Sequence, residues 1–408
     1  MNITSKIVIA IVSICLVFSN ISCLQGNTGT VDSLVQQSSG LQVGAERIPK
    51  YLPIIKDKTI AVVANQTSLV GTRHLVDTLV SLGVSIKCVF APEHGFRGEA
   101  GAGDKIQDSK DLQTGLSIVS LYGKHMKPTA DDLKGVEVVI FDIQDVGVRF
   151  YTYISTLQYV MEACIENSVA LIILDRPNPN GFYVDGPVLD ESFRSFVGMQ
   201  KIPVVHGMTI GEYSKMLIGE SWIERPEKLN LHIVEVANYS HKDKYQLPIR
   251  PSPNLPNMQS VYLYPSLCFF EGAAVSIGRG TDFPFQCYGF PGMDGADFKF
   301  KPVAIPGVAT NPPYKDTVCS GIDLRKAVTG PSNLPAKLRL DFLISAYSLF
   351  PDKNKFFNPF FEKLSGTNEL RYQIINSESE EMIRKSWEPE LSAFKKIRKK
   401  HLLYEDFE

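Results

Sequence analysis

The most informative segment of the chain runs from Val84 to Gly103 and reads VSIKCVFAPEHGFRGEAGAG. It begins as a mainly apolar run, which is typical of a buried strand in a parallel sheet. The run ends abruptly in a polar segment rich in glycine. Because ligands in open α/β sheets bind just beyond the carboxyl ends of the strands, this segment is a candidate site. Its ionisable side chains belong to Glu93, His94, Arg97 and Glu99.

Three further segments repeat this pattern of an apolar run followed by polar, glycine or proline residues. They read KTIAVVANQTS from Lys58, VEVVIFDIQDVG from Val136 and VALIILDRPNPNG from Val169. Helix-like stretches lie between them, for example residues 75–82 and 152–167. Strands that alternate with helices predict βαβ units and an α/β fold with a parallel sheet.

The second half of the chain has a different character. Three prolines within residues 251–256 break regular structure and indicate a domain boundary. Aromatic-rich loops, a β-like middle and two helical stretches near residues 338–350 and 377–401 follow. We expect a first domain over residues 45–253 and a smaller α+β domain over residues 254–408.

Charge and composition exclude some classes of partner. The 408 residues are 44% hydrophobic and 21% charged, as in ordinary soluble proteins. The formal net charge of −2 at pH 7 gives no electrostatic reason to expect nucleic acid or an anionic membrane as a partner.

The first 22 residues have the features of an export signal. Lys6 precedes the apolar run of residues 7–18, and small residues follow. The run is too short for a membrane-spanning helix, which needs about 20 apolar residues. We therefore expect an exported protein with residues 1–22 as its signal peptide.

Cys23, preceded by Ser22, resembles the lipid-attachment cysteine of bacterial lipoproteins, although Asn20 departs from the usual aliphatic residue. Residues 23–44, rich in Ser, Gly, Gln and Asn, then form a flexible tether. The expected location is the periplasm or an outer-membrane anchor, and a cleaved secreted protein is the alternative. The only expected membrane contact is this lipid anchor.

The remaining cysteines and the absent motifs argue against several chemistries. Cys88 lies in an apolar run and Cys164 in an expected helix, so both are predicted to be buried thiols. The spacing of the cysteines fits no zinc site, and the chain has no Walker A, dinucleotide-binding, HExxH or GxSxG motif. We expect no metal or organic cofactor.

Glu93 is the leading catalytic candidate. A carboxyl group at a strand end, shielded by neighbouring phenylalanines, suits a general acid. The alternative is a structural role, in which Glu93 pairs with Arg97 or caps the following segment. His94 either orients Glu93 or serves as a hydrogen-bonding strut in the turn.

The segment FDIQDVGVRFYTY provides a second group of candidates. Asp142 and Asp145 follow a strand at a spacing that suits a pair of metal ligands, a base, or simple hydrogen bonding within the loop. Gln144 is suited to reading a sugar hydroxyl or acetamide, and Arg149 and Tyr151 to holding an anion and a ring. Alternatively, these residues brace the neighbouring Glu93 loop.

Two more strand ends carry candidate ligand contacts. In DRPNPNG, two prolines give a rigid loop that presents Asp175, Arg176 and Asn178, although an internal pairing of Asp175 with Arg176 explains the same residues. His206 follows a further predicted strand, where a structural role competes with ligand contact.

The segment EGAAVSIGRGTDFPFQ opens the expected second domain. Its Gly–Arg–Gly presents Arg279 on a flexible backbone close to aromatic residues, with Glu271 and Asp282 nearby. Such a segment could close a cleft between two domains, which is a common ligand location. The alternative is interdomain packing alone.

Taken together, these motifs resemble the NamZ family of exo-β-N-acetylmuramidases. The matching segments extend from about Ile48 to Gln286 and read PEHGFRGE, FDIQDVGVRFYTY, DRPNPNG, GPVLD, PVVHGMTIGE, SPNLP and YPSLCFFEGAAVSIGRGTDFPFQ. The resemblance implies a Rossmann-like catalytic domain followed by a smaller domain. It also implies removal of N-acetylmuramic acid from the non-reducing end of peptidoglycan fragments, with Glu93 as the family's catalytic glutamate.

The residue types fit that chemistry. Glycoside hydrolysis usually needs an acid and a second carboxylate, for which Glu99, Asp142 and Asp145 are candidates; the substrate's own acetamide is the alternative nucleophile. The lactyl carboxylate of muramic acid requires a cation, and the candidates are Arg97, Arg149, Arg176 and Arg279.

Two other functions compete with this one. A metal-dependent hydrolase would use Asp142, Asp145 and His206. A non-catalytic surface protein that binds muropeptides or sugars would bind without turnover.

Overall fold

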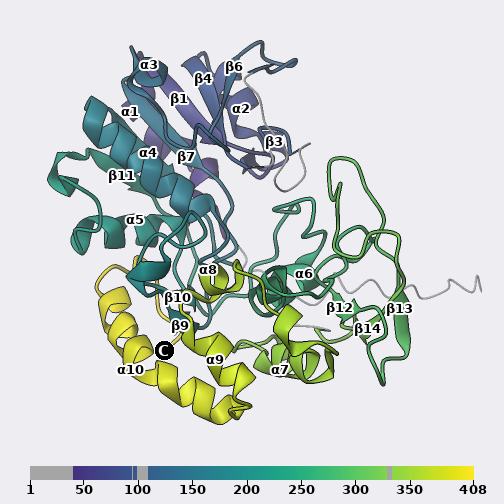
Figure 1. The fold of residues 1–408 in the computed structure, drawn as a ribbon. Helices are drawn as coiled ribbons and strands as arrows, with labels where there is room; N and C mark the ends of the chain where they lie inside the picture. Colours follow the sequence, from purple (N-terminus) through teal and green to yellow (C-terminus); the bar gives the residue numbers. More distant parts are fainter. Residues whose placement is uncertain (1–39, 94, 99–108, 329–332) are drawn as a thin grey trace, which may run out of the picture. The chain divides into compact units, whose positions relative to one another are not determined.

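The computed structural model describes residues 40–93, 95–98, 109–328 and 333–408, which belong to one compact unit (Figure 1). The predicted signal peptide, most of the predicted tether and the candidate residues Cys23, His94 and Glu99 lie outside the described residues.

A seven-stranded, mostly parallel sheet forms the core of the N-terminal part, with strand order β11-β8-β7-β1-β4-β6-β5. The short β5 pairs antiparallel with β6, and the other neighbours are parallel. The four apolar segments of the sequence are β8, β7, β1 and β4, which lie side by side, so the predicted α/β class is confirmed. The strands are β1 (Thr59–Ala64), β4 (Ser85–Ala91), β5 (Ser109–Lys110), β6 (Ser117–Ser120), β7 (Val138–Asp142), β8 (Ala170–Leu174) and β11 (Leu231–Val234).

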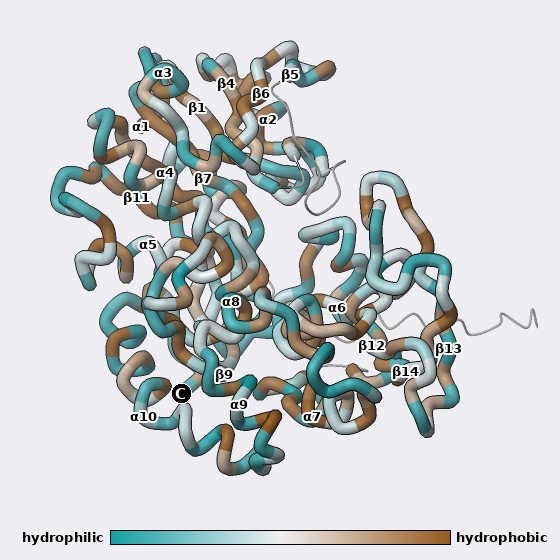
Figure 2. The backbone as a smooth tube through the Cα atoms, viewed as in Figure 1, coloured by the Kyte–Doolittle hydropathy of each residue, from teal (hydrophilic) through white to brown (hydrophobic). Residues whose placement is uncertain are grey.

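Helices cover both faces of this sheet, because alternate side chains of a strand point to opposite faces. Val62 and Ile140 pack in one apolar cluster with α1 and α2, whereas Val63 and Phe141 pack in another with α4 and α5. Figure 2 shows the central strands largely in the colours of hydrophobic residues. The helices of this part are α1 (Ile48–Ile55), α2 (Leu75–Ser81), α3 (Ala130–Leu133), α4 (Tyr153–Asn167) and α5 (Ile210–Gly219).

Two short antiparallel ribbons lie outside the large sheet. One pairs β2 (Leu69–Val70) with β3 (Arg73–His74), and the other pairs β9 (Asp185–Val188) with β10 (Pro203–Val205). His206 therefore follows a strand of a separate ribbon, not a further strand of the parallel sheet. The described residues include the 3₁₀ helices η2 (Gly44–Glu46), η3 (Glu191–Phe193), η4 (Pro226–Lys228), η5 (Cys268–Gly272) and η7 (Lys353–Lys355).

The C-terminal part is a smaller domain with a three-stranded antiparallel sheet in the order β12-β14-β13. Its last helix returns to the N-terminal part, where Arg384 Nη1 donates to Asp185 Oδ2 of β9 over 2.9 Å. The elements are α6 (Met258–Leu267), β12 (Cys287–Phe290), β13 (Phe298–Phe300), β14 (Cys319–Asp323), α7 (Leu340–Leu349), α8 (Phe361–Ser365), α9 (Glu369–Ile375) and α10 (Glu380–Lys399).

Cys88 and Cys164 are buried free thiols, as predicted. The last residues of the predicted tether (residues 23–44) contact the folded part, because Gln42 pairs with Ala237 and Val43 is buried. Within the described residues, every helix is too short or too polar to cross a membrane.

Candidate active site

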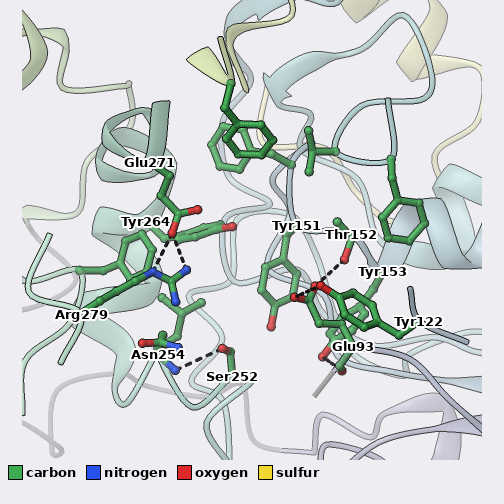
Figure 3. Close-up of a pocket in the computed structure, with 16 residues that line it drawn as sticks. Glu93, Tyr122, Tyr151, Thr152, Tyr153, Ser252, Asn254, Tyr264, Glu271 and Arg279 are labelled. Atoms are coloured by element: carbon green, nitrogen blue, oxygen red, sulfur yellow. Dashed lines mark hydrogen bonds and ion pairs between the residues drawn. The ribbon is translucent and has the colours of Figure 1, made fainter. Parts of the chain in front are cut away.

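A pocket of about 240 Å³ collects side chains from both parts of the chain (Figure 3). The N-terminal part contributes loops that follow β4, β6 and β7, and the C-terminal part contributes α6, η5 and the loop after η5. The lining residues are Glu93, Tyr122, Phe150, Tyr151, Thr152, Tyr153, Phe196, Val197, Ser252, Asn254, Leu255, Tyr264, Glu271, Arg279, Phe285 and Phe360.

Glu93 lies in this pocket just beyond the end of β4, and two hydroxyl groups hold its carboxylate. Tyr122 Oη donates to Oε1 over 3.1 Å, and Thr152 Oγ1 donates to Oε2 over 3.2 Å. Each carboxylate oxygen is thereby oriented by a separate neighbouring loop. A carboxyl group held in a defined direction at a strand end can deliver a proton to a bound ligand.

The opposite wall carries an ion pair between Glu271 of η5 and Arg279 of the following loop (Figure 3). Arg279 Nε donates to Glu271 Oε1 over 2.7 Å, and Nη2 bonds the same oxygen. The Arg279 guanidinium also lies 5.2 Å from the centre of the Phe285 ring. The pocket therefore presents a fixed charge pair across from Glu93.

The loop before α6 adds polar groups that the motif search did not single out. Asn254 is 1% exposed, and its Nδ2 donates to Val308 O over 2.9 Å. Its Oδ1 is buried and accepts no hydrogen bond from the described residues. Tyr151, which also lines the pocket, donates through its hydroxyl to Pro251 O over 2.9 Å.

Asp142 and Arg176 are placed away from the pocket lining and bind each other. Arg176 Nε lies 2.6 Å from Asp142 Oδ1, and Nη2 lies 2.9 Å from Oδ2. The Asp142 side chain is fully buried. Gln144 is buried beside them and donates to the carbonyls of Asp145 and Pro177. These three residues therefore brace the ends of β7 and β8, and these hydrogen bonds do not reach the Glu93 loop.

Asp145 is also buried outside the pocket lining. Its Oδ1 accepts from Gly147 N over 2.6 Å, while Oδ2 has no hydrogen-bond partner among the described residues. Burial disfavours the ionised form and raises the pKa of Asp145 to about 7, against the lowering effect of the Gly147 and Val146 amides. The group is therefore a buried acid that titrates near neutral pH.

Arg149 has no exposed surface and is enclosed by backbone carbonyls. Burial lowers its pKa to about 9, so the guanidinium remains charged at neutral pH. This cation joins the β9–β10 ribbon to α8 instead of facing the pocket. Its two Nη atoms donate to the carbonyls of Pro187, Ile202, Leu364 and Ser365 over 2.6–2.9 Å.

Arg97 likewise points away from the pocket, although it follows Glu93 closely in sequence. It makes paired hydrogen bonds with Asp77 and with Asp111, and its guanidinium lies 4.5 Å from the centre of the Phe96 ring. The structure shows this arrangement instead of the alternative Glu93–Arg97 pair, because two other carboxylates accept hydrogen bonds from four of the five N–H groups of Arg97.

Asp175 and Asn178 are buried among hydrogen-bond partners. Asp175 accepts from the hydroxyls of Thr209 and Tyr404, and burial raises its pKa to about 6. Asn178 Nδ2 donates to Met208 O over 2.8 Å. The hypothesis that Asp175 pairs with Arg176 is not what the structure shows, since Arg176 binds Asp142.

His206 and Asp282 complete the set of sequence candidates. His206 is fully buried, its Nδ1 accepts from Met208 N, and burial lowers its pKa to about 3, so the ring is neutral. Asp282 is exposed and lies outside the pocket lining. Among the described residues, no three His, Cys, Asp or Glu side chains are grouped to hold a metal ion.

The structure thus brings together four of the sequence candidates: Glu93, Tyr151, Glu271 and Arg279. It adds Tyr122, Thr152, Asn254 and a set of aromatic side chains that sequence reasoning did not single out. The signals were present for two of them, because Thr152 lies in the FYTY run and Asn254 in the SPNLP segment. Tyr122 follows a short strand and carries no motif of its own.

An oriented carboxylate, a fixed charge pair and an aromatic lining define a site for acid–base chemistry on a small polar ligand. Comparison with known proteins then identifies the family. The models for the N-terminal and C-terminal parts of exo-beta-N-acetylmuramidase NamZ match residues 60–259 and 262–404. The chain belongs to the NamZ family.

Individual relatives agree with this assignment. The chain is 37% identical over 384 residues to the peptidoglycan beta-N-acetylmuramidase NamZ of Bacillus subtilis, and the alignment covers 89% of this chain and 91% of the relative. It is also similar to two solved DUF1343 family proteins of Bacteroides fragilis. The first has a TM-score of 0.83 and 44% identity, and the match covers 90% of this chain and 100% of that protein's chain. The second has a TM-score of 0.78 and 28% identity, and the match covers 90% of this chain and 99% of the second protein.

Proposed function

We propose that this protein is an exo-acting glycosidase that releases β-1,4-linked N-acetylmuramic acid from the non-reducing end of peptidoglycan fragments. The observation that carries the proposal is the oriented Glu93 carboxylate in an enclosed, aromatic-lined pocket, in a chain of the NamZ family. The volume of about 240 Å³ lies just below the range of about 300–1,000 Å³ for drug-sized ligands. It therefore suits one terminal sugar unit, as exo action requires.

Glu93 acts in this proposal as the general acid. Its proton passes to the glycosidic oxygen as the bond to C1 breaks. In one route, water attacks C1 directly and gives its proton to a carboxylate base. In the other, the acetamide oxygen of the substrate attacks C1, and water then opens the resulting ring and returns a proton to Glu93. The anomeric configuration of the released sugar, together with inhibition by a thiazoline analogue of the acetamide intermediate, distinguishes these two routes.

The test compares wild type and Glu93→Gln on a chromogenic β-N-acetylmuramide and the matching β-N-acetylglucosaminide. We expect release from the muramide by wild type and a loss of about 10²–10⁴-fold in kcat for Glu93→Gln. Glu388→Gln, which changes an exposed glutamate of α10, is the matched control.

Each rival function has its own signature in the same experiment. No release from either substrate by wild type would refute the glycosidase proposal, and binding without turnover would favour the sugar-binding alternative. Release from the glucosaminide alone would overturn the proposed specificity for N-acetylmuramic acid. Activity that requires added metal and disappears with a chelator would favour the metal-dependent hydrolase.

We also propose that residues 1–22 direct export and that Cys23 carries a lipid anchor, so that the enzyme meets peptidoglycan fragments outside the cytoplasm during cell-wall turnover and recycling. The motif around Cys23 supports this proposal. Metabolic labelling with a radioactive fatty acid should mark the wild-type protein and not Cys23→Ser. An unlabelled but exported wild type would indicate the plainly secreted alternative.

A further inference from the structure

Arg279 is distinguished from the other candidate arginines by where its guanidinium lies. Arg97, Arg149 and Arg176 are held by carboxylates or carbonyls away from the pocket. Among the described residues that line the pocket, Arg279 alone carries a positive charge. An anionic group of a ligand in this pocket therefore has one described cation within reach.

The backbone around Arg279 is built to fix this side chain. Gly278 and Gly280 adopt left-handed conformations with φ of +76° and +81°, which favour glycine. A Cβ atom on Gly280 would lie 2.3 Å from Val303 O, so the loop packs closely against the neighbouring chain. The hydroxyl of Thr281 donates to Gly278 O over 2.6 Å and closes the turn. Arg279 is thus presented by a tight, braced turn.

Glu271 accepts hydrogen bonds from only two of the three nitrogen atoms of the Arg279 guanidinium. Its Oε1 takes the hydrogen bonds from Nε and Nη2, and Nη1 makes no hydrogen bond with the described residues. Both hydrogens of Nη1 and the second hydrogen of Nη2 are therefore not used by the described residues. Together they form the edge of a guanidinium that binds a carboxylate in bidentate fashion. A carboxylate bound there lies nearer to Arg279 than to Glu271, and the nearer charge dominates because Coulomb energy falls with distance.

We propose that Arg279 selects substrates that carry the lactyl carboxylate of muramic acid, with Glu271 as the residue that positions its guanidinium. The inference rests on the proposed function. Muramic acid differs from glucosamine by a lactyl ether on O3, whereas Glu93 must reach the oxygen on C1. C1 and C3 are separated by one ring carbon, so their substituents can contact the two opposite walls on which Figure 3 shows Glu93 and Arg279.

The experiment measures a ratio that a structural role does not change. The substrates are a chromogenic β-N-acetylmuramide and its lactyl carboxamide, which has the same shape without the charge. We expect wild type to favour the carboxylate by about tenfold or more in kcat/KM, and Arg279→Met to reduce that preference to about one. Arg279→Lys keeps the positive charge but lacks the paired donors of the planar guanidinium, so it should retain an intermediate preference for the carboxylate substrate. Arg325→Met is the matched control, because Arg325 also pairs with an acid and lies over Phe283 but is outside the pocket lining.

The outcomes separate the two proposals. If wild type cleaves neither compound, the proposed function fails, and this inference fails with it. If wild type is active and Arg279→Met lowers both kcat/KM values equally or leaves the ratio unchanged, the inference alone is overturned. If Arg279→Met does not fold, as judged by its melting transition, the ratio for Arg279→Lys decides by itself.

Discussion

Arg176 and Asp142 form a bidentate ion pair inside the protein, with distances of 2.6 Å and 2.9 Å between their paired atoms. The two side chains are 3% and 0% exposed. Arg176 also donates to Leu69 O over 2.9 Å, so the pair links β7, the loop after β8 and the β2–β3 hairpin. Two residues that look like ligand contacts in the sequence thus bind each other across neighbouring strand ends.

Replacing Asp142 tests whether its role is structural. Asp142→Asn leaves the Arg176 guanidinium buried without its counter-ion, and we expect a loss of about 3–5 kcal/mol in the free energy of unfolding, measured with urea. The kcat of the folded fraction should fall less than tenfold. Asp131→Asn, at an exposed position of α3, is the control. Unchanged stability with a thousandfold loss of kcat would instead make Asp142 a catalytic residue.

The two hydroxyls that hold Glu93 should affect turnover more than binding. Tyr122→Phe and Thr152→Val each remove one donor to the carboxylate. We expect kcat for the muramide to fall about tenfold in each variant with little change in KM, because orientation of the acid matters mainly in the transition state. Tyr372→Phe, on the exposed surface of α9, serves as the comparison. A change in KM alone would assign the hydroxyls to substrate binding.

Arg149 should contribute to the stability of the fold and not to the recognition of the negatively charged substrate. Arg149→Met removes the cation shared by four backbone carbonyls, which belong to β9, to Ile202 just before β10, and to α8. These acceptors then remain buried without a donor. We expect a loss of about 3 kcal/mol or more in unfolding free energy. The preference for the lactyl carboxylate over the carboxamide should stay at the wild-type value. A lost preference at normal stability would show that Arg149, not Arg279, recognises the anion.

The raised pKa of Asp145 predicts that the stability of the fold depends on pH. Burial raises its pKa to about 7 from 3.8, so between these pH values the unfolded chain releases a proton that the folded protein keeps. The unfolded state therefore binds fewer protons, and stability falls as pH rises through this window. From pH 5 to pH 8 the loss from this group is about 3 kcal/mol.

Asp145→Asn should remove this loss. Melting temperatures of wild type should fall more steeply than those of the variant between pH 5 and pH 8, with Asp297→Asn, an exposed aspartate, behaving like wild type. Parallel curves for wild type and Asp145→Asn would contradict the prediction.

Much of the fold could be predicted because its signals are local. The apolar runs at β1, β4, β7 and β8 are long enough to read as buried strands, and the stretches between them have helical character. The position of His206 could not be read in this way. The run Pro203–Val205 is apolar like the others, but it pairs with β9 in a separate ribbon, and strand pairing is a contact between distant residues.

The parallel α/β class, the strand ends at which polar residues gather and Glu93 as the leading candidate all follow from local sequence patterns. Which of those polar side chains face a pocket depends on how distant segments pack together. Arg97, Arg149 and Arg176 are all close to predicted strand ends, yet each has its charge taken up by buried acceptors. Arg279 and Asn254 come from the other part of the chain and line the same pocket as Glu93. A sequence pattern specifies where a side chain lies along its strand, but its partners come from segments that meet only when the chain folds.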